Sequence, residues 1–226
     1  MNKKSVLFIF GSLLFSTYYY FLTLSVAKDT FRDIDYEIML EIQKMIHIKF
    51  DIPFSYITLL GSSEFIIFWL IILFFAVFLY YKKYFYSLIF ILLIYLFEIA
   101  GKIFIFHPKP PSTLTRNILD LALPSSSIIN PQNAFPSGHT ARTTFLLIII
   151  FFLITNSNLV KTQKIIFYST IGLVFILIII SRISLGEHWY SDVLGGVTLG
   201  LISSFLALAF YPPSHKNRRY KPSGAL

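Results

Sequence analysis

The sequence predicts an all-α polytopic membrane protein with six transmembrane helices in a single domain that covers residues 1–226. Only 13% of the 226 residues are charged and 56% are hydrophobic, whereas soluble domains carry roughly 25% charged residues. Cysteine is absent, so neither a disulfide framework nor a thiolate metal site is available. A spanning helix needs about 20 mostly apolar residues. The predicted spans are about 5–27, 62–81, 84–106, 138–158, 165–185 and 189–211.

The distribution of charge predicts how these helices are oriented. A net charge of +8 would suggest nucleic-acid binding in a soluble protein, but here the charge follows the loops, and we expect no nucleic-acid partner. Cytoplasmic segments carry an excess of Lys and Arg. We therefore expect both termini, alternate loops and the basic tail (214–226) in the cytoplasm. The basic residues there are Lys3, Lys4, Lys82, Lys83, Lys161, Lys164, Lys216, Arg218, Arg219 and Lys221. All 11 carboxylates lie at or toward the opposite, outer face of the cell membrane.

Residues 5–27 have two interpretations. Lys3 and Lys4 before an apolar run that ends at Ser25 and Ala27 resemble a signal peptide with its cleavage site. The run is longer than the ~7 to 15 residues of a signal core, which favours a spanning helix. In both interpretations residue 28 lies outside, so the orientation of the later spans is unchanged.

Residues 28–57 carry charges of both signs, and apolar residues recur among them at helical spacing. These residues are Ile34, Ile38, Ile42 and Met45. The pattern predicts an amphipathic helix on the outer membrane surface. Its simplest role is to connect two spans, and the alternative is to shape the entry of lipid to a site. The second span then begins at Gly61–Glu64, where a serine hydroxyl caps the helix.

The third span contains two charged residues near its outer end, Glu98 and Lys102. A lysine near the centre of a bilayer costs roughly 2.5 to 3.5 kcal/mol, so Lys102 should face protein, water or an anion. An ion pair with Glu98, four residues earlier, is the simpler explanation and is compatible with anion binding. The segment His107–Pro111 ends the helix, because proline cannot continue it.

A long outer loop, residues 107–135, precedes the fourth span and is rich in Pro, Ser and Asn. Such a long loop within a compact domain usually covers or builds a site. It leads to Ser137, Gly138 and His139 at the start of a helix. The N–H groups at a helix N-terminus can bind a phosphate oxygen, although an ordinary capped helix start has the same pattern.

The link between the fifth and sixth spans contains a candidate nucleophile. If a helix begins near His188, Asp192 lies one turn later on the same face, where it can accept the Nδ1 proton and leave Nε2 free to attack. Arg182 adds positive charge beside this pair. A His–Asp pair at this spacing is also typical of helix capping or of the protein surface. Gly196 and Gly200, further along, are spaced for close helix packing.

Together these segments resemble the type 2 phosphatidic acid phosphatase superfamily of membrane lipid phosphatases. The family pattern is a lysine, six residues and Arg-Pro; then Pro-Ser-Gly-His; then Ser-Arg, five residues, His, three residues and Asp. The corresponding segments here are Lys102–Pro110, Pro136–His139 and Ser181–Asp192. The second and third match fully. The first departs, because Lys109 occupies the arginine position, and lysine lacks the planar fork with which arginine binds two phosphate oxygens.

The resemblance implies an active site at the outer ends of the helices. His188 would attack phosphorus and form a phosphohistidine, while Asp192 fixes its tautomer. His139 would protonate the leaving oxygen and then activate water. We expect no cofactor and no metal ion, because positive charges and N–H donors would stabilise the phosphoryl group. The expected phosphate-binding residues are Lys102, Lys109, Ser137, Gly138 and Arg182.

The apolar spans predict a lipid substrate and argue against the soluble acid phosphatases and vanadium haloperoxidases, which share the motifs. An outward site on a small six-span protein favours a polyprenyl diphosphate such as undecaprenyl diphosphate, a lipid carrier of cell-wall synthesis. Phosphatidylglycerophosphate or phosphatidate is the alternative. From another class, the chain could be a non-catalytic lipid binder or transporter. Membrane lipids are the expected surroundings, and no obligatory protein partner is inferred.

Overall fold

The computed structural model describes residues 3–81, 85–119 and 132–210, and the regular elements in these ranges are helical. The predicted basic tail (214–226) lies outside the described residues. The α-helices are α1 (Lys3–Ala27), α2 (Arg32–Met45), α3 (Asp51–Thr58), α4 (Ser63–Tyr81), α5 (Ile91–Phe104), α7 (Gly138–Thr155), α8 (Lys161–Ser184) and α9 (Tyr190–Ala209). The 3-10 segments are η1 (Ile48–Phe50), η2 (Leu59–Gly61), η3 (Phe85–Phe90) and η4 (Ser112–Leu114).

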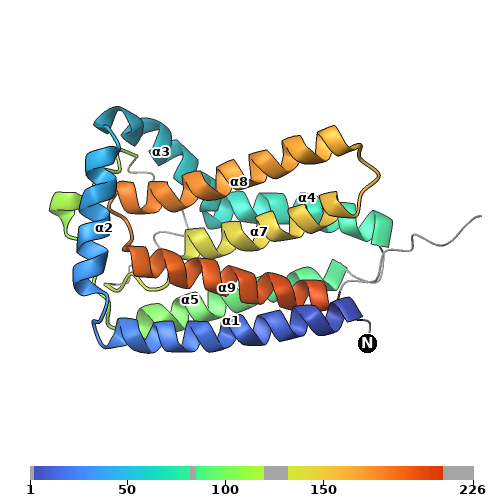
Figure 1. Cartoon of the computed structure of the whole chain (residues 1–226), viewed down its shortest axis with the longest axis horizontal. Coiled ribbons are helices and arrows are strands. Elements are labelled where there is room, and N and C mark those ends of the chain that lie inside the picture. Colours follow the sequence, from blue (N-terminus) through green and yellow to red (C-terminus); the bar gives the residue numbers. More distant parts are fainter. Residues whose placement is uncertain (1–2, 82–84, 120–131, 211–226) are drawn as a thin grey trace, which may run out of the picture.

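The long helices form an elongated bundle, and α2 lies across one end of it (Figure 1). In the described ranges, 5 helices are long and apolar enough to cross a membrane. The count becomes 6 if Ile48–Gly61 and Ser63–Leu79, which meet at an angle of 50°, form one bent span. The prediction of an all-α multi-pass membrane protein is therefore confirmed.

The surface segment differs from the single helix predicted over residues 28–57. The chain extends at Ile46 (φ −98°, ψ 111°), and the side chain of His47 then accepts the backbone N–H of Lys49 at 3.2 Å, which starts a new helical turn. Two α-helices, α2 and α3, result. The prediction was wrong because the spacing of the apolar residues does not reveal the break, which depends on capping by His47.

The orientation of α2 shows that this helix does more than connect two spans. Of the predicted apolar stripe, Ile34 is 48% exposed and Met45 is 75% exposed. Asp35 and Met39, which are four residues apart and share a face, are buried. The helix therefore turns a carboxylate toward the protein and leaves apolar side chains at the surface.

The centre of the bundle is the contact of α9 with α7 and α1. A β-carbon at Gly196 would lie 2.4 Å from the carbonyl oxygen of Ser137, and one at Gly200 would lie 2.6 Å from that of Ala141. Only glycine permits this approach of the two backbones, as the spacing predicted. Phe145 and Leu199 fill the adjacent core. The close contact brings the first turns of α7 and α9 together.

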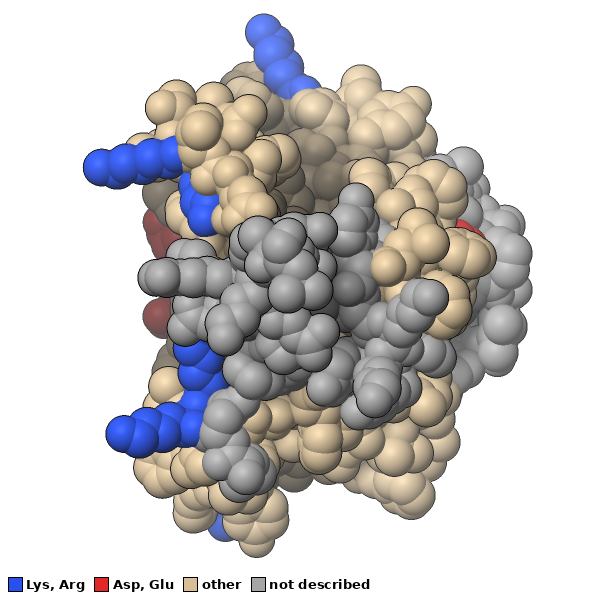
Figure 2. Space-filling model, turned by 90° about the vertical axis from the view of Figure 1, so that its right-hand side faces the viewer, with Lys and Arg blue, Asp and Glu red and all other residues tan. Residues whose placement is uncertain are grey.

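The two ends of the bundle differ in charge. The ends of a helix such as α8 lie about 36 Å apart, so its first residue, Lys161, is far from the end that α2 covers. Lys3 and Lys4 begin α1 at the same distant end. Figure 2 looks onto this end, where Lys and Arg side chains project at several places and few carboxylates are visible.

Candidate active site

The three sequence motifs meet at the end of the bundle near α2. The backbone N–H of Ser137 donates to the carbonyl of Asp192 at 3.0 Å, which joins the starts of α7 and α9. The side-chain amide of Asn133 donates to the carbonyl of Lys102 at 3.1 Å, which joins the end of α5 to the segment before α7. Hydrogen bonds to backbone carbonyls thus fix segments that are far apart in the sequence.

His188 and Asp192 form the predicted pair at the start of α9. The carboxylate of Asp192 caps the helix by accepting the backbone N–H of Trp189 at 2.9 Å, and the same oxygen lies 3.3 Å from His188 Nδ1. Burial lowers the pKa of His188, the neighbouring charges of Arg182 and Lys102 lower it further, and Asp192 opposes them. The imidazole is therefore neutral near pH 7. Its Nε2 atom makes no hydrogen bond to a described residue.

Arg182 lies at the end of α8, directly before the turn that carries His188. One terminal nitrogen of its guanidinium donates to the hydroxyl of Thr58 at 2.5 Å and pairs with the carboxylate of Glu187. The side chain is buried, yet its Nε–H group has no partner among the described residues. A buried donor without a partner is costly, so this group is available to an oxygen of a ligand.

A second group of charges surrounds Glu98 on α5. Its carboxylate pairs with Lys102 at 2.8 Å, which confirms the predicted ion pair, and with Arg142 of α7 at 2.5 Å. The Arg142 guanidinium also lies over the ring of Tyr95, 5.3 Å from its centroid. Two cations share one buried carboxylate, so the group keeps a net positive charge that can attract an anion.

The start of α7 faces the same charges. The hydroxyl of Ser137 lies 3.0 Å from that of Thr140, so it is held at the N-terminus without capping the backbone. A β-carbon at Gly138 would lie 1.9 Å from the Glu98 carboxylate, so only glycine fits there. His139 follows on the first turn and lies against Gly61. An anion site at this N-terminus stays a prediction.

Lys109 lies at the rim of these charges. Its side chain is exposed and forms no ion pair with a described residue, and its backbone N–H donates to Gln132 at 3.3 Å. Partial burial and the charge of Lys102 lower the pKa of Lys109, and Glu187 opposes them. Lys109 is therefore within electrostatic reach of Lys102 and Glu187, and its contact with phosphate stays a prediction.

Two residues that the sequence reasoning did not assign to the site are Asp35 and His107. The Nδ1 atom of His107 lies 2.8 Å from the second carboxylate oxygen of Asp192, and its Nε2 atom lies 3.5 Å from Asp35. All three side chains are buried. The sequence carried only a weak signal, namely a histidine directly after a span.

The described part of the outer loop is tied to α2 and α3. Arg116 pairs with Asp51 of α3 at 3.2 Å and donates to the carbonyl of Gln43 at 3.0 Å. The amide of Gln43 donates in turn to the carbonyl of Leu114 at 2.8 Å. Asn117 contacts Glu187. These contacts join the described part of the loop to α2, to α3 and to Glu187, the ion-pair partner of Arg182.

Comparison with known proteins agrees with the motifs. A sequence model described as the PAP2 superfamily matches residues 80–216, which contain all three motif segments. The chain belongs to the PAP2 superfamily. The predicted resemblance is confirmed.

Among the described residues, no group of three or more His, Asp or Glu side chains is arranged to hold a metal ion.

Individual members of the superfamily share sequence and fold with the chain. Phosphatidylglycerophosphatase B of Bacillus subtilis (strain 168) is 37% identical over 78 residues, or 34% of this chain and 38% of that protein, so the match spans less than half of the relative. The crystal structure of the first transmembrane PAP2 type phosphatidylglycerolphosphate phosphatase from Bacillus subtilis has a TM-score of 0.69 at 24% identity and covers 94% of this chain and 100% of that chain. The crystal structure of Aquifex aeolicus LpxE has a TM-score of 0.56 at 24% identity and covers 76% of this chain and 93% of that chain. Both superpositions show the fold.

Proposed function

We propose that the protein is a membrane lipid phosphatase that forms a phosphohistidine at His188 and releases inorganic phosphate. One observation carries the proposal: buried His188 lies next to buried Arg182, and neither the Nε2 atom of the histidine nor the Nε–H group of the arginine has a partner among the described residues. Asp192 holds the other nitrogen of the histidine, and Arg182 lacks a described partner for its donor. A neutral nucleophile beside an unsatisfied cationic donor is suited to attack on a phosphoryl group.

In the first step, the lone pair of His188 Nε2 forms a bond to phosphorus, and the bond from phosphorus to the leaving oxygen breaks. The leaving oxygen keeps the bonding electrons and receives a proton from His139, whose protonated form the negative phosphoryl group would stabilise once it is bound among the cations. Asp192 accepts the Nδ1–H group and stabilises the positive charge that the imidazole acquires. The lipid alcohol or lipid phosphate then leaves.

In the second step, water attacks the phosphorus atom of the phosphohistidine. His139, now neutral, takes a proton from this water as the new P–O bond forms. The P–N bond breaks, and its electrons return to His188 Nε2. Inorganic phosphate is released with His188 neutral and His139 protonated again, so the cycle closes without another reactant.

The proposed phosphate-binding residues are Lys102, Lys109, Ser137, Gly138 and Arg182. Two carboxylates now pair with the cations of this set, Glu98 with Lys102 and Glu187 with Arg182. A phosphoryl group would compete with these carboxylates for the cations. Because a buried cation without any partner is costly, the carboxylates also stabilise these cations before a phosphoryl group binds.

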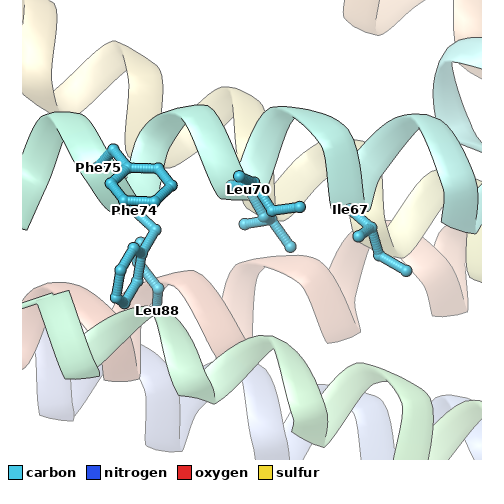
Figure 3. A pocket seen from close by; sticks show the side chains of 6 residues that line it. Ile67, Leu70, Phe74, Phe75 and Leu88 are labelled. Atoms are coloured by element: carbon cyan, nitrogen blue, oxygen red, sulfur yellow. The ribbon is translucent and has the colours of Figure 1, made fainter.

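The substrate is proposed to be a lipid because the helix bundle carries an apolar groove between α4 and η3. Figure 3 shows its lining side chains, which come from α4 and η3; they are Ile67, Leu70, Ile71, Phe74, Phe75 and Leu88. The groove runs along α4 from Ile67 to Phe75, and its apolar lining suits an acyl or prenyl chain. Gly61, which ends η2 two residues before α4, lies against His139 of the candidate site.

Two substrate classes have specific support. The name of the 37% identical relative, phosphatidylglycerophosphatase B, favours phosphatidylglycerophosphate. A site on the outer face favours a polyprenyl diphosphate such as undecaprenyl diphosphate, and phosphatidate is a further monophosphate candidate. The reaction chemistry proposed above is the same for all of them.

The proposed orientation puts the termini in the cytoplasm and the candidate site on the outer face of the cell membrane. The basic residues at the start of α1 and α8 support it, because such residues are retained on the cytoplasmic side. Cysteine accessibility tests it, since the chain contains no native cysteine. A single cysteine at Lys109 should react with an impermeant maleimide in intact cells, and one at Lys161 should not.

The function itself is tested by phosphate release from purified protein in detergent with EDTA present. We expect phosphate release from at least one of phosphatidylglycerophosphate, undecaprenyl diphosphate and phosphatidate, and none from the His188→Ala variant. Binding of these lipids without turnover would support the lipid binder or transporter instead. Activity that requires added divalent metal would contradict the metal-independent mechanism.

A further inference from the structure

The carboxylate of Asp192 is shared between two histidines. One oxygen contacts His188 Nδ1 at 3.3 Å, and the other contacts His107 Nδ1 at 2.8 Å. None of the Asp192 side chain is exposed, and only 6% of the His107 side chain is exposed. The shorter contact is therefore made by the histidine for which the proposed reaction has no use.

His107 has a second buried carboxylate at its other nitrogen. Its Nε2 atom lies 3.5 Å from Asp35, whose side chain is 1% exposed. The position of Asp35 is fixed from α9, because its two oxygens accept the backbone N–H of Ser191 at 2.7 Å and its hydroxyl at 2.6 Å. Ser191 is the residue before Asp192, so α2 and α9 are joined at the proposed nucleophile.

This geometry determines the protonation state of His107. An ionised carboxylate only accepts hydrogen bonds, so contacts to carboxylates from both ring nitrogens require a proton on each nitrogen. The charged groups that face the ring are Asp192 from α9 and Asp35 from α2. Burial lowers the pKa of His107, but the hydrogen bonds and charges of both carboxylates outweigh it and raise the pKa to about 9. At pH 7 the ring is an imidazolium.

We propose that His107, held by Asp35, is a positioning residue that orients Asp192 and keeps the proton affinity of His188 low. The inference rests on the proposed function of His188. A cation on one oxygen of Asp192 reduces the attraction of that carboxylate for a proton on His188. His188 therefore stays neutral and nucleophilic at neutral pH, while the fixed carboxylate still orients its ring.

The decisive variant is His107→Gln, which keeps a polar side chain of similar length but removes the charge. We expect kcat to fall roughly 10-fold with KM within about 2-fold, because the residue does not touch the substrate. The acid limb of kcat/KM, which reports protonation of His188, should shift to higher pH by about one unit. An unchanged kcat with an unchanged acid limb would overturn the proposal. The exposed His47 provides the matched control, since His47→Gln should leave both unchanged.

A double-mutant cycle tests whether Asp35 acts through His107. Asp35→Asn keeps partners for Ser191 but removes the negative charge that faces the imidazolium. We expect Asp35→Asn to lower kcat, and the double variant with His107→Gln to lie within about 2-fold of His107→Gln alone. If the double variant instead lost kcat by the product of the two single losses, Asp35 would act independently of His107.

The wild-type protein supplies a measurement that does not depend on the folding of a variant. In nitrogen-15 NMR spectra of protein labelled at its 5 histidines, one ring should keep both protons up to about pH 9. Titration of every histidine below pH 7 would overturn the proposal even if His188→Ala is inactive. Full activity of His188→Ala would instead refute the proposed function.

Discussion

The two sides of Asp192 have opposite electrostatic character. On one side, His188 faces Arg182 and Lys102, which lower its pKa together with burial. On the other side, His107 lies between two carboxylates that raise its pKa to about 9 against the effect of burial. The same side-chain type is therefore neutral on one side of a carboxylate and charged on the other.

This difference shows that burial alone does not decide how a histidine behaves in the protein. Both rings are more than nine-tenths buried, with 7% of His188 and 4% of His107 exposed. The difference comes from their neighbours: two carboxylates bond His107, whereas the cations Arg182 and Lys102 lie near His188. The cationic side is suited to bind an anion and keep a nucleophile neutral, and the anionic side is suited to hold the carboxylate that orients this nucleophile.

Removing the nucleophile on the cationic side should have the largest effect. We expect His188→Ala to reduce kcat by about 10⁴-fold or more, since loss of a nucleophile removes the covalent route. The measurement is phosphate release, together with acid-labile labelling of the protein from a radiolabelled lipid phosphate. Labelling should vanish with activity, and persistent phosphate release would refute the phosphohistidine.

Removing the cation beside the nucleophile should have the next largest effect. We expect Arg182→Ala to reduce kcat/KM by roughly 10²- to 10³-fold, because a preorganised donor to the transition state is lost. Arg182→Ala also leaves the carboxylate of Glu187 without its partner. The control is therefore the double variant with Glu187→Gln, in which this carboxylate is absent. Arg116→Ala, which removes an arginine bonded to Asp51 on the α2 and α3 side, should lower activity far less than Arg182→Ala. Equal losses would remove the distinction between the two sides.

On the anionic side, the charge of His107 should make the stability of the protein depend on pH. The pKa of His107 is raised from 6.5 to about 9 in the folded protein, so the folded state binds more protons between these values. Stability from this group is therefore complete below pH 6.5 and is lost as pH rises to about 9, by about 3 kcal/mol in total. The midpoint of thermal unfolding in detergent should fall over this range in the wild type and less steeply in His107→Gln. Parallel curves would show that His107 is not the group responsible.

The rim of the cationic side should tolerate the most change. We expect Lys109→Arg to retain activity or raise it up to about 10-fold, because arginine restores a two-pronged contact with phosphate while the charge is unchanged. The measurement is kcat/KM with one lipid phosphate, and Lys49→Arg on η1 is the matched control. A large loss would mean that Lys109 does not contact the phosphoryl group.

Much of the fold and of the motif set could be predicted because the relevant interactions are local. The apolar spans follow from composition, and the Glu98–Lys102 pair and the His188–Asp192 pair each follow from residues one helical turn apart. Gly196 and Gly200 indicated close packing, and the structure adds that the partner is α7. The break between α2 and α3 was missed because capping by His47 overrides the apolar period.

By itself, the sequence determined that the chain crosses a membrane and that it contains the lipid phosphatase motifs. It also determined which helix ends carry Lys102, Ser137 and His188. These properties depend on composition and on spacings of a few residues. Only the tertiary structure decided that His107 contacts both Asp192 and Asp35, and that Asp35 accepts hydrogen bonds from Ser191, which is 156 residues away in the sequence. A buried charge reaches its partner through the packing of whole helices, and no local pattern encodes that contact.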